Sequence, residues 1–339
     1  VAGAGLSGSI GGPVNFNRTL DRYGAHGIER QWFNDSRNDK FSLTQASGFA
    51  VLSNRQGNGI MKDLISVSDL IKLEQEKSVL LFDCRANLMD PQAGKLAWLE
   101  GHIPGARHVD LNLQLSSPHI PGLTGRHPLP DRDSWINQVK QWGISPEVSV
   151  VAYDDAGGAF AARMWWLLRW IGHDNTAVLD GGWQAWLDAG GESSSLAAED
   201  RAVSDYDYAA LKPLSRTIDV EDIDGSKQLL LDARDRKRFN GEVEPIDPVA
   251  GHIPGAICSP MSDNLDAAGH FKSVTELKDK FTVADKTGND VVCYCGSGIT
   301  AAHNILAMRV AGMKEPALYA GSWSEWITNP SRPVAKNTE

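Results

Sequence analysis

Cys295 has the sequence setting of a reactive cysteine. It opens the segment CGSGIT (295–300), between the apolar run DVVCY (290–294) and a helical pattern that begins at about Thr300. Gly296 and Gly298 let the backbone curl so that several N–H groups face one centre, and the helix start adds partial positive charge. Such a nest binds an anion and favours a thiolate. Ser297 and Thr300 can add hydroxyl donors, whereas a small buried core thiol is the alternative for Cys295 alone.

The other three cysteines are expected to be structural. Cys293 precedes Cys295 by two residues, so strand periodicity places it on the same side, one step deeper. Cys84 and Cys258 fit core or near-core thiols. No Cys/His cluster has ligand spacing, so the sequence predicts neither metal nor cofactor. Four cysteines are too few for a disulfide scaffold in a chain this long, which favours a reducing compartment, the cytoplasm.

The chain contains an internal repeat, which locates the elements around this loop. Four blocks recur in the same order. They are LLFDCR (80–85) with LLLDAR (229–234), GHIPGA (101–106) with GHIPGA (251–256), VVAYDDAGG (150–158) with VVCYCGSGI (291–299), and LDGGWQAW (179–186) with LYAGSWSEW (318–326). Asp154 stands where the second copy has Cys295, so only the second copy has a nucleophile at this position. The first copy has extra residues, placed in SSPHIPGLTGRHPLP (116–130).

The blocks define the expected domains. The first copy is predicted over 62–190, a polar, Ser-rich and acidic linker over 191–213, and the second copy over 214–330. Residues 1–61 are rich in Gly, Asn, Ser and Arg without sustained periodicity, and are expected to be a flexible extension. No basic stretch followed by an apolar core opens the chain, so no signal peptide is expected, although a mature form that has lost one fits equally well.

Each copy alternates strand and helix patterns. Short apolar runs such as SVLLFD (78–83) and QLLLD (228–232) suit strands buried on both faces of a parallel sheet. Helical patterns lie between them, and AARMWWLLRWIG (161–172) and TAAHNILAMRVAG (300–312) each end at a glycine, as helices commonly do. The expected fold is α/β, with two tandem domains that each have a central, mostly parallel sheet and helices on both faces.

Composition excludes two classes of partner. The chain has 339 residues, 42% of them hydrophobic and 22% charged, with a net charge of −10. Nucleic-acid binding needs an excess of Lys and Arg, so nucleic acid is not expected as a partner. No run of about eighteen apolar residues occurs, so no membrane span is expected. A small anionic substrate needs only one local basic pocket and fits this composition.

These motifs together resemble the tandem rhodanese family. The GHIPGA blocks, the DCR and DAR strand ends, the DGGWQAW block and the CGSGIT loop agree in order and spacing over about residues 62–330. The family comprises thiosulfate and 3-mercaptopyruvate sulfurtransferases. The resemblance implies that Cys295 takes the outer sulfur of a donor as a persulfide and passes it to a thiophilic acceptor such as thioredoxin, a small thiol or cyanide.

The resemblance also implies site residues and a donor. Thiosulfate-preferring members have basic residues after the cysteine, whereas Gly296 and Ser297 stand here, as in mercaptopyruvate-type members. Ser297 corresponds to the family serine that works with a His and an Asp of the first domain, which the motifs match to His102 and Asp90. Arg238 corresponds to the arginine that binds the substrate carboxylate, while the backbone of Gly296, Gly298, Ile299 and Thr300 surrounds the sulfur.

Several alternatives bear on this interpretation. The family's second arginine is absent, since Ile246-Asp247-Pro248 stand in that region, and a thiosulfate:cyanide sulfurtransferase is the alternative enzyme. Arg85, Arg234 and His252 are expected to be structural, the arginines in ion pairs at strand ends. A cysteine-dependent phosphatase needs C-x5-R, but Ala301 stands where that arginine would be. A sulfur-carrier module loaded by a partner protein is the non-enzymatic alternative.

Overall fold

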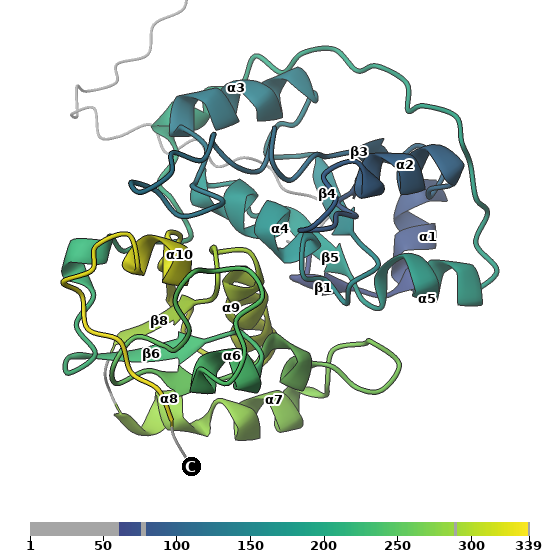
Figure 1. Cartoon of the computed structure of the whole chain (residues 1–339). Coiled ribbons are helices and arrows are strands. Elements are labelled where there is room, and N and C mark those ends of the chain that lie inside the picture. Colours follow the sequence, from purple (N-terminus) through teal and green to yellow (C-terminus); the bar gives the residue numbers. More distant parts are fainter. Residues whose placement is uncertain (1–60, 76–78, 288–289, 338–339) are drawn as a thin grey trace, which may run out of the picture. The chain divides into compact units, whose positions relative to one another are not determined.

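The computed structural model describes residues 61–75, 79–287 and 290–337. The extension expected over 1–61 therefore lies, apart from its last residue, outside the described residues. The described residues all belong to one compact unit, which contains both copies of the repeat. Figure 1 shows a sheet with its helices in each copy.

The first copy has a five-stranded sheet in which every pair of neighbours is parallel. The strand order is β1-β5-β4-β2-β3. Its strands are β1 (Leu64–Ile65), β2 (Val79–Asp83), β3 (Arg107–His108), β4 (Ser149–Tyr153) and β5 (Thr176–Leu179). Its helices are α1 (Val67–Gln75), α2 (Ala93–Glu100), α3 (Arg132–Gln141), α4 (Ala161–Trp170) and α5 (Gly182–Asp188).

The second copy has a four-stranded parallel sheet of the same plan. The order is β7-β6-β8-β9. Its strands are β6 (Gln228–Asp232), β7 (Ile257–Cys258), β8 (Asp290–Tyr294) and β9 (Ala317–Leu318). Its helices are α6 (Arg236–Asn240), α7 (Val274–Lys280), α8 (Thr282–Thr287), α9 (Thr300–Val310) and α10 (Ser322–Trp326). The short 3₁₀ turns are Tyr208–Ala210, Val220–Asp222 and Met261–Asn264.

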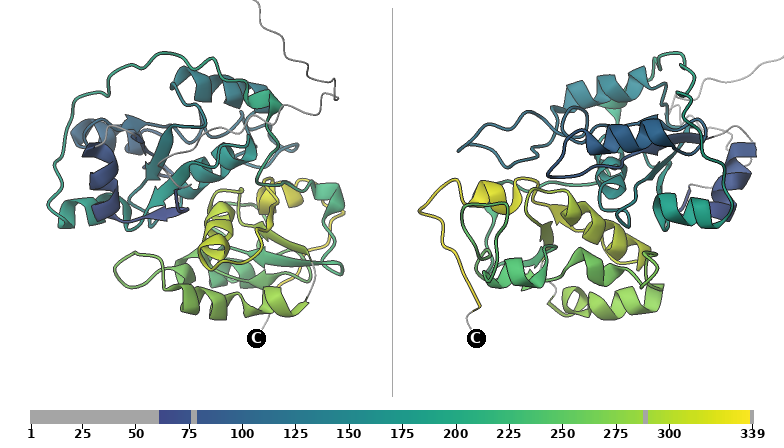
Figure 2. Two further views of the ribbon diagram at one scale, coloured as in Figure 1. Left: turned by 180° about the vertical axis from the view of Figure 1, so that it is seen from behind. Right: turned by 45° about the vertical axis from the view of Figure 1, so that its right-hand side comes forward.

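Alternate residues of the central strands belong to different cores, as strand geometry requires. Phe82 of β2 and Cys293 of β8 join one large core that also includes residues of α3, α4, α7 and α9. Leu81, from the opposite face of β2, packs with residues of α1 and α5. Val292, from the opposite face of β8, packs with residues of α10. The predicted two-copy α/β fold is confirmed, with helices on both faces of each parallel sheet (Figure 2).

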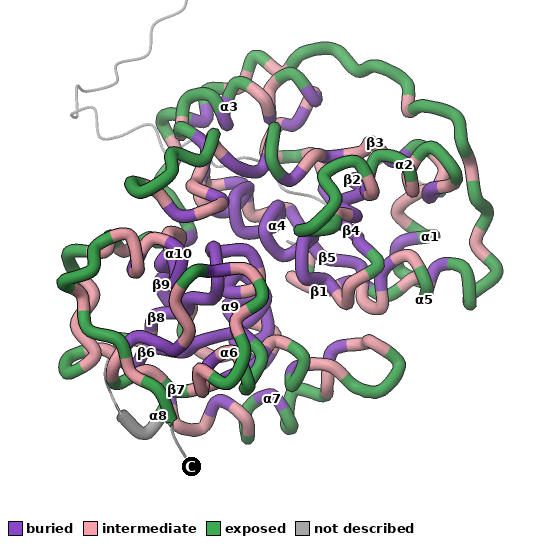
Figure 3. The backbone as a smooth tube through the Cα atoms, viewed as in Figure 1, coloured by how far each residue is buried: buried purple, intermediate pink, exposed green. Residues whose placement is uncertain are grey.

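Helices α4 and α9 are buried along most of their length (Figure 3). They follow β4 and β8, pack against each other, and contribute to the core that the two copies share. Each is followed by a glycine with positive φ, Gly172 at 94° and Gly312 at 74°, so the predicted helix ends are confirmed. Among the described residues, none of the helices is long and apolar enough to cross a bilayer.

The two copies share a buried ion pair at equivalent strand ends. Arg85 Nη2 lies 2.6 Å from Asp83 Oδ2, and Arg234 Nη2 lies 2.7 Å from Asp232 Oδ2. The same Nη2 atoms donate to the carbonyls of the GHIPGA glycines, Gly101 and Gly251. The structural role expected for both arginines is therefore confirmed, and it explains why the DCR and DAR blocks repeat together with GHIPGA.

Candidate functional site

Cys295 follows β8 directly and faces the start of α9. Its side chain is 2% exposed, and Sγ accepts a hydrogen bond of 3.1 Å from the Gly298 N–H. Gly298 has φ of 80°, and a Cβ there would lie 2.3 Å from the Ala320 carbonyl oxygen. Only glycine can therefore adopt this turn without moving the backbone, and the turn aims an N–H at the sulfur.

Helix α10 fixes the cysteine loop from the other side. The N–H of Cys295 donates to Ser322 Oγ at 3.1 Å, while Trp323 N–H and Ser324 N–H donate to the carbonyls of Cys295 and Gly296, each at 3.0 Å. Ser322 has φ of 55°, and among the described residues it is the only non-glycine with positive φ. Such a backbone conformation persists only where the surroundings hold it, and here Ser322 Oγ bonds both the Cys295 N–H and the Tyr319 carbonyl.

The hydroxyl of Ser297 is held by a histidine of the first copy. Ser297 Oγ lies 2.8 Å from His127 Nδ1, and both side chains are buried. Burial lowers the pKa of His127 to about 3, with Arg163 and Arg126 adding to the effect, so the imidazole is neutral at physiological pH. The pair is therefore a neutral, oriented hydroxyl–imidazole contact beside Cys295.

The structure does not bring His102 or Asp90 to Ser297. The ring nitrogens of His102 lie 2.7 Å from the Trp98 carbonyl and 3.0 Å from the Leu196 carbonyl, within the first copy and its linker. Asp90 is exposed and accepts from the Gln92 N–H. This corrects the assignment made from sequence. The second-copy equivalent, His252, likewise bonds the Phe239 carbonyl at 2.7 Å, so the histidine of GHIPGA is structural in both copies.

Two guanidinium groups lie over Gly296. A Cβ at Gly296 would be 2.9 Å from Arg126 Nη2 and 3.5 Å from Arg238 Nη2. Arg238 comes from α6, as the sequence indicated, and Arg126 comes from the extra segment of the first copy. Both are partly exposed, with 17% and 22% of their side chains accessible. Because Gly296 has no side chain, the guanidinium groups of Arg126 and Arg238 can approach the loop closely.

Two carboxylates neutralise these cations. Asp247 forms an ion pair with Arg126 and another with Arg238, the latter at 3.2 Å, and Glu244 Oε1 lies 2.7 Å from Arg238 Nη2. Burial alone would raise the pKa of Glu244, but its bonds with Arg238 and backbone N–H groups lower it. Asp247 therefore occupies the region of the missing family arginine as the partner of an arginine from the other copy.

Ile299, Thr300 and the other three cysteines contribute no side chain to the site as far as their contacts show. The side chain of Ile299 is buried in the core, so it can contribute only its backbone to the loop, and Thr300 begins α9. Cys293 and Cys84 are buried core thiols, and burial raises the pKa of each. Burial also raises the pKa of Cys258 to about 11. Within the described residues no group of His, Cys, Asp and Glu could hold a metal ion.

The first copy fills the corresponding loop with a carboxylate. Asp154 follows β4 as Cys295 follows β8, and it is fully buried. Its oxygens accept four backbone N–H bonds, each of 2.8 Å, from Ala156, Gly158, Phe160 and Ala161. The loop of the copy that lacks a nucleophile thus also directs several backbone N–H groups at one centre, which the Asp154 carboxyl occupies. Burial raises the pKa of this carboxyl, and the four N–H bonds act in the opposite direction.

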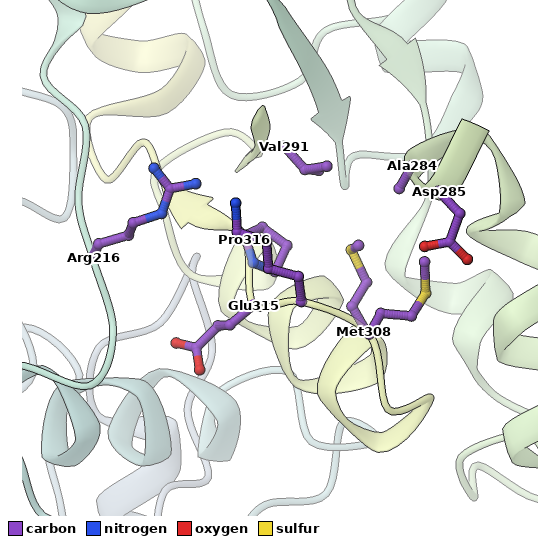
Figure 4. Close-up of a pocket in the computed structure, with 9 residues that line it drawn as sticks. Arg216, Ala284, Asp285, Val291, Met308, Glu315 and Pro316 are labelled. Carbon is purple, nitrogen blue, oxygen red and sulfur yellow. The ribbon is translucent and has the colours of Figure 1, made fainter. Parts of the chain in front are cut away.

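The second copy also contains a cavity of about 200 Å³ (Figure 4). It is lined by Arg216, Ala284, Asp285, Val291, Met308, Met313, Lys314, Glu315 and Pro316. None of these residues belongs to the cysteine loop or to the arginines over it. The cavity and the cysteine loop are therefore separate features of the second copy.

Sequence reasoning missed His127 and Arg126 because both lie in the segment without a counterpart in the second copy. Comparing the two copies draws attention to what they share, which led to the histidine of GHIPGA. The available signal was the segment GRHPLP (125–130) itself, where an arginine and a histidine follow a glycine within a proline-rich insertion.

Known proteins similar to this chain agree with the two-copy fold. The rhodanese-like domain model matches residues 66–189 and 218–329. A probable 3-mercaptopyruvate sulfurtransferase of Pseudomonas aeruginosa is 46% identical over 80% of this chain and 97% of its own length. A putative thiosulfate sulfurtransferase, SseB, of Mycobacterium tuberculosis is 39% identical over 81% and 97%. The solved 3-mercaptopyruvate sulfurtransferase from Leishmania major superposes with a TM-score of 0.70 at 30% identity, over 80% of this chain and 75% of that one. With two matching domains and full-length relatives of this similarity, the chain belongs to the rhodanese family as a tandem, two-domain member.

Proposed function

We propose that the protein is a sulfurtransferase that moves the sulfur of 3-mercaptopyruvate to a thiol acceptor through a persulfide on Cys295. The observation that carries this proposal is the position of the Cys295 sulfur in a glycine loop, with Arg126 and Arg238 over Gly296. The names of the similar proteins, which are sulfurtransferases acting on mercaptopyruvate or thiosulfate, support the same class.

In the first half-reaction, Arg238 binds the donor carboxylate and Arg126 adds a second cation. The Cys295 thiolate attacks the donor sulfur, an S–S bond forms, and the C–S bond of the donor breaks. The electron pair of that bond leaves as the enolate of pyruvate, which takes a proton. Ser297, which contacts His127, is placed to donate a hydrogen bond from its hydroxyl to the developing enolate oxygen.

In the second half-reaction, an acceptor thiolate attacks the outer sulfur of the persulfide. A new S–S bond forms on the acceptor, the S–S bond to Cys295 breaks, and the Cys295 thiolate is regenerated. Thioredoxin or a small thiol is the proposed acceptor. Backbone N–H groups such as that of Gly298 stabilise the sulfur anion at each stage.

The charges over the loop favour a donor with one negative charge. Arg126 and Arg238 are balanced by Asp247 and Glu244, so the four charges sum to zero. Thiosulfate is a dianion without a carboxylate and would approach two carboxylates. A thiosulfate:cyanide sulfurtransferase is the second candidate function, because the relative from Mycobacterium tuberculosis is named as a putative thiosulfate sulfurtransferase.

Steady-state turnover of 3-mercaptopyruvate and thiosulfate, measured side by side at equal low concentration, tests this proposal. We expect faster turnover of mercaptopyruvate, and one extra sulfur, about 32 Da, on Cys295 after donor treatment. Cys295→Ser is expected to abolish transfer and keep the fold. Faster turnover of thiosulfate would overturn the donor, and added sulfur on Cys293 or Cys84 would overturn the nucleophile.

Arg238 provides a matched comparison within the same experiment. Arg238→Ala should lower catalytic efficiency by roughly ten- to a hundredfold, since charge-assisted bonds contribute roughly 1.5–3 kcal/mol. Arg236 lies on the same helix, with 61% of its side chain exposed, so Arg236→Ala controls for helix α6. Turnover without any partner protein separates an enzyme from a carrier module that a partner loads.

We also propose the cytoplasm as the site of action. All four cysteines of the chain are free thiols, and a persulfide carrier requires a reducing compartment with thiol acceptors.

A further inference from the structure

Arg163 of α4 is a charged side chain with no exposed surface. Its guanidinium donates only to backbone carbonyls. These are Gly298 at 3.2 Å from Nη1, His127 at 3.2 Å, Leu115 at 3.3 Å and Pro128 at 3.4 Å from Nη2, with a further 3.4 Å contact from Nε to Leu115. One side chain thus binds both ends of the extra segment of the first copy and the cysteine loop of the second.

Arg163 lacks the partner that other buried arginines have. Arg85 and Arg234 are paired with carboxylates within their own copies. Over the described ranges, no Asp or Glu forms an ion pair with Arg163. A buried cation without an anion is costly, because carbonyl dipoles do not replace the lost hydration completely. Burial lowers the pKa of Arg163 to about 10, which leaves it charged at neutral pH, and the charge of Cys295 acts in the opposite direction.

Gly298 links this cation to the sulfur. Its carbonyl accepts from Arg163 Nη1 at 3.2 Å, and its N–H donates to Cys295 Sγ at 3.1 Å. The other cations of the site, Arg126 and Arg238, already have carboxylate partners. Among the described groups, Arg163 is therefore the buried positive charge beside Cys295 that no carboxylate neutralises.

The remaining titratable groups near the sulfur are neutral at physiological pH. His127, bonded to Ser297, has a pKa lowered to about 3. Cys293 on the same strand has a pKa raised by burial, so its thiol stays protonated. Neither group can take the place of Arg163 as a counter-charge.

We propose that Arg163, a positioning residue supplied by the copy without a nucleophile, is the counter-ion of the Cys295 thiolate and, later, of its persulfide. The persulfide part rests on the function proposed above, whereas the thiolate part does not. The arrangement gives a reason for the unpaired Arg163 in α4, whose other buried arginine, Arg169, is paired with Asp174 and Glu315. It also gives the first copy an electrostatic role in chemistry that takes place on the second.

The control is a similar contact in the opposite direction, from a helix of the second copy to a loop of the first. His303 of α9 lies with Nε2 2.9 Å from the Gly157 carbonyl, in the loop that follows β4. Gly157 and Gly298 occupy equivalent places in the repeated block. Burial lowers the pKa of His303 to about 4, so this contact joins the two copies without carrying a charge at neutral pH.

The test is the rate of alkylation of Cys295 by iodoacetamide between pH 5 and 10, with fragment mass spectrometry to assign the label to Cys295 and not Cys293. Arg163→Met and Arg163→Gln should slow alkylation at pH 7 by about tenfold or more, equivalent to at least one pH unit in the midpoint. Arg163→Lys should keep the midpoint within about half a unit and still lower kcat, because an ammonium lacks the fork that holds the carbonyls. His303→Gln should leave the midpoint unchanged.

Folded neutral variants with the wild-type profile would overturn the proposal. So would a shift of one unit or more in Arg163→Lys, or an equal shift in His303→Gln, since either would assign the effect to packing and not charge. If Arg163→Met does not fold, Arg163→Gln and Arg163→Lys decide the question. Alkylation needs no sulfur donor, so an Arg163-dependent profile in a protein that transfers no sulfur would reject the proposed function alone.

Discussion

His127 and His102 differ in what their rings contact, although both are buried. His127 reaches across to Ser297 of the other copy, whereas His102 bonds two carbonyls of its own copy and stacks on Trp98 with ring centroids 4.5 Å apart. Residue type and burial therefore do not distinguish a site histidine from a structural one. The hydrogen-bond partner of each ring nitrogen distinguishes them.

This difference yields opposite expectations for the two rings. His127→Ala should lower kcat/KM by about tenfold with little change in thermal stability, because Ser297 loses the contact that orients its hydroxyl. His102→Ala should lower the unfolding temperature and leave kcat/KM of the folded fraction unchanged. Donor kinetics and calorimetry on both variants check this. A large kinetic loss in His102→Ala alone would restore the assignment made from sequence.

At the scale of elements, the extra segment 116–130 of the first copy completes the active loop of the second. Arg126 N–H donates to Ser324 Oγ at 3.0 Å, and a Cβ on Gly125 would lie 2.4 Å from the Gly321 carbonyl oxygen. The backbones approach so closely here that only glycine fits. The segment carries Arg126 and His127 next to each other, so its contact with Gly321 and Ser324 determines the position of both side chains at the loop.

Gly125→Val should therefore lower sulfur transfer by on the order of a hundredfold, because misplacement by about 1 Å has costs of that size. Far-UV circular dichroism should be unchanged, since the segment has neither helix nor strand. Leu123→Ala is the matched control, because Leu123 lies in the same segment and is 65% exposed. Equal activity of Gly125→Val and wild type would show that this docking has no catalytic role.

Elements were predictable from the sequence wherever the two copies agree. The apolar runs became β2, β4, β6 and β8, and the glycine-ended patterns became α4 and α9, because burial between helices requires continuous apolar strands. The motifs also indicated Arg238 and Cys295, whose roles at the site stay predictions. The self-comparison gave no information about segment 116–130, because the second copy has no counterpart of it and its bonds to the cysteine loop and α10 join residues far apart in the sequence. Arg163 was also missed, although a charge inside the apolar run AARMWWLLRW was a usable signal.

At the scale of the whole chain, the two copies of the repeat contribute different groups to the site. The second copy keeps the nucleophile, while the first keeps the loop geometry around Asp154 and supplies Arg126, His127 and Arg163. The large core that both copies share makes this division stable, because the two sheets bury one face each in it.

Burial of uncharged histidines couples stability to pH. Burial lowers the pKa of His127 to about 3 and that of His173 and His303 to about 4. An unfolded histidine titrates near 6.5, so the unfolded chain binds more protons between pH 6.5 and about 4. The free energy of unfolding must therefore fall as pH falls through this window and level off below it.

Urea unfolding at pH 7.5 and pH 5 measures this effect. Each of the three rings should contribute a loss of about 2 kcal/mol at pH 5, from roughly 1.5 pH units at 1.36 kcal/mol per unit. His173 is the ring to replace, because it lies outside the cysteine loop and bonds Tyr208 Oη at 3.0 Å and the Asn175 carbonyl at 3.1 Å. His173→Gln should be less stable than wild type at pH 7.5, since the amide fits these partners less well, yet lose about 2 kcal/mol less on acidification. An equal loss in variant and wild type would show that other groups govern the acid sensitivity.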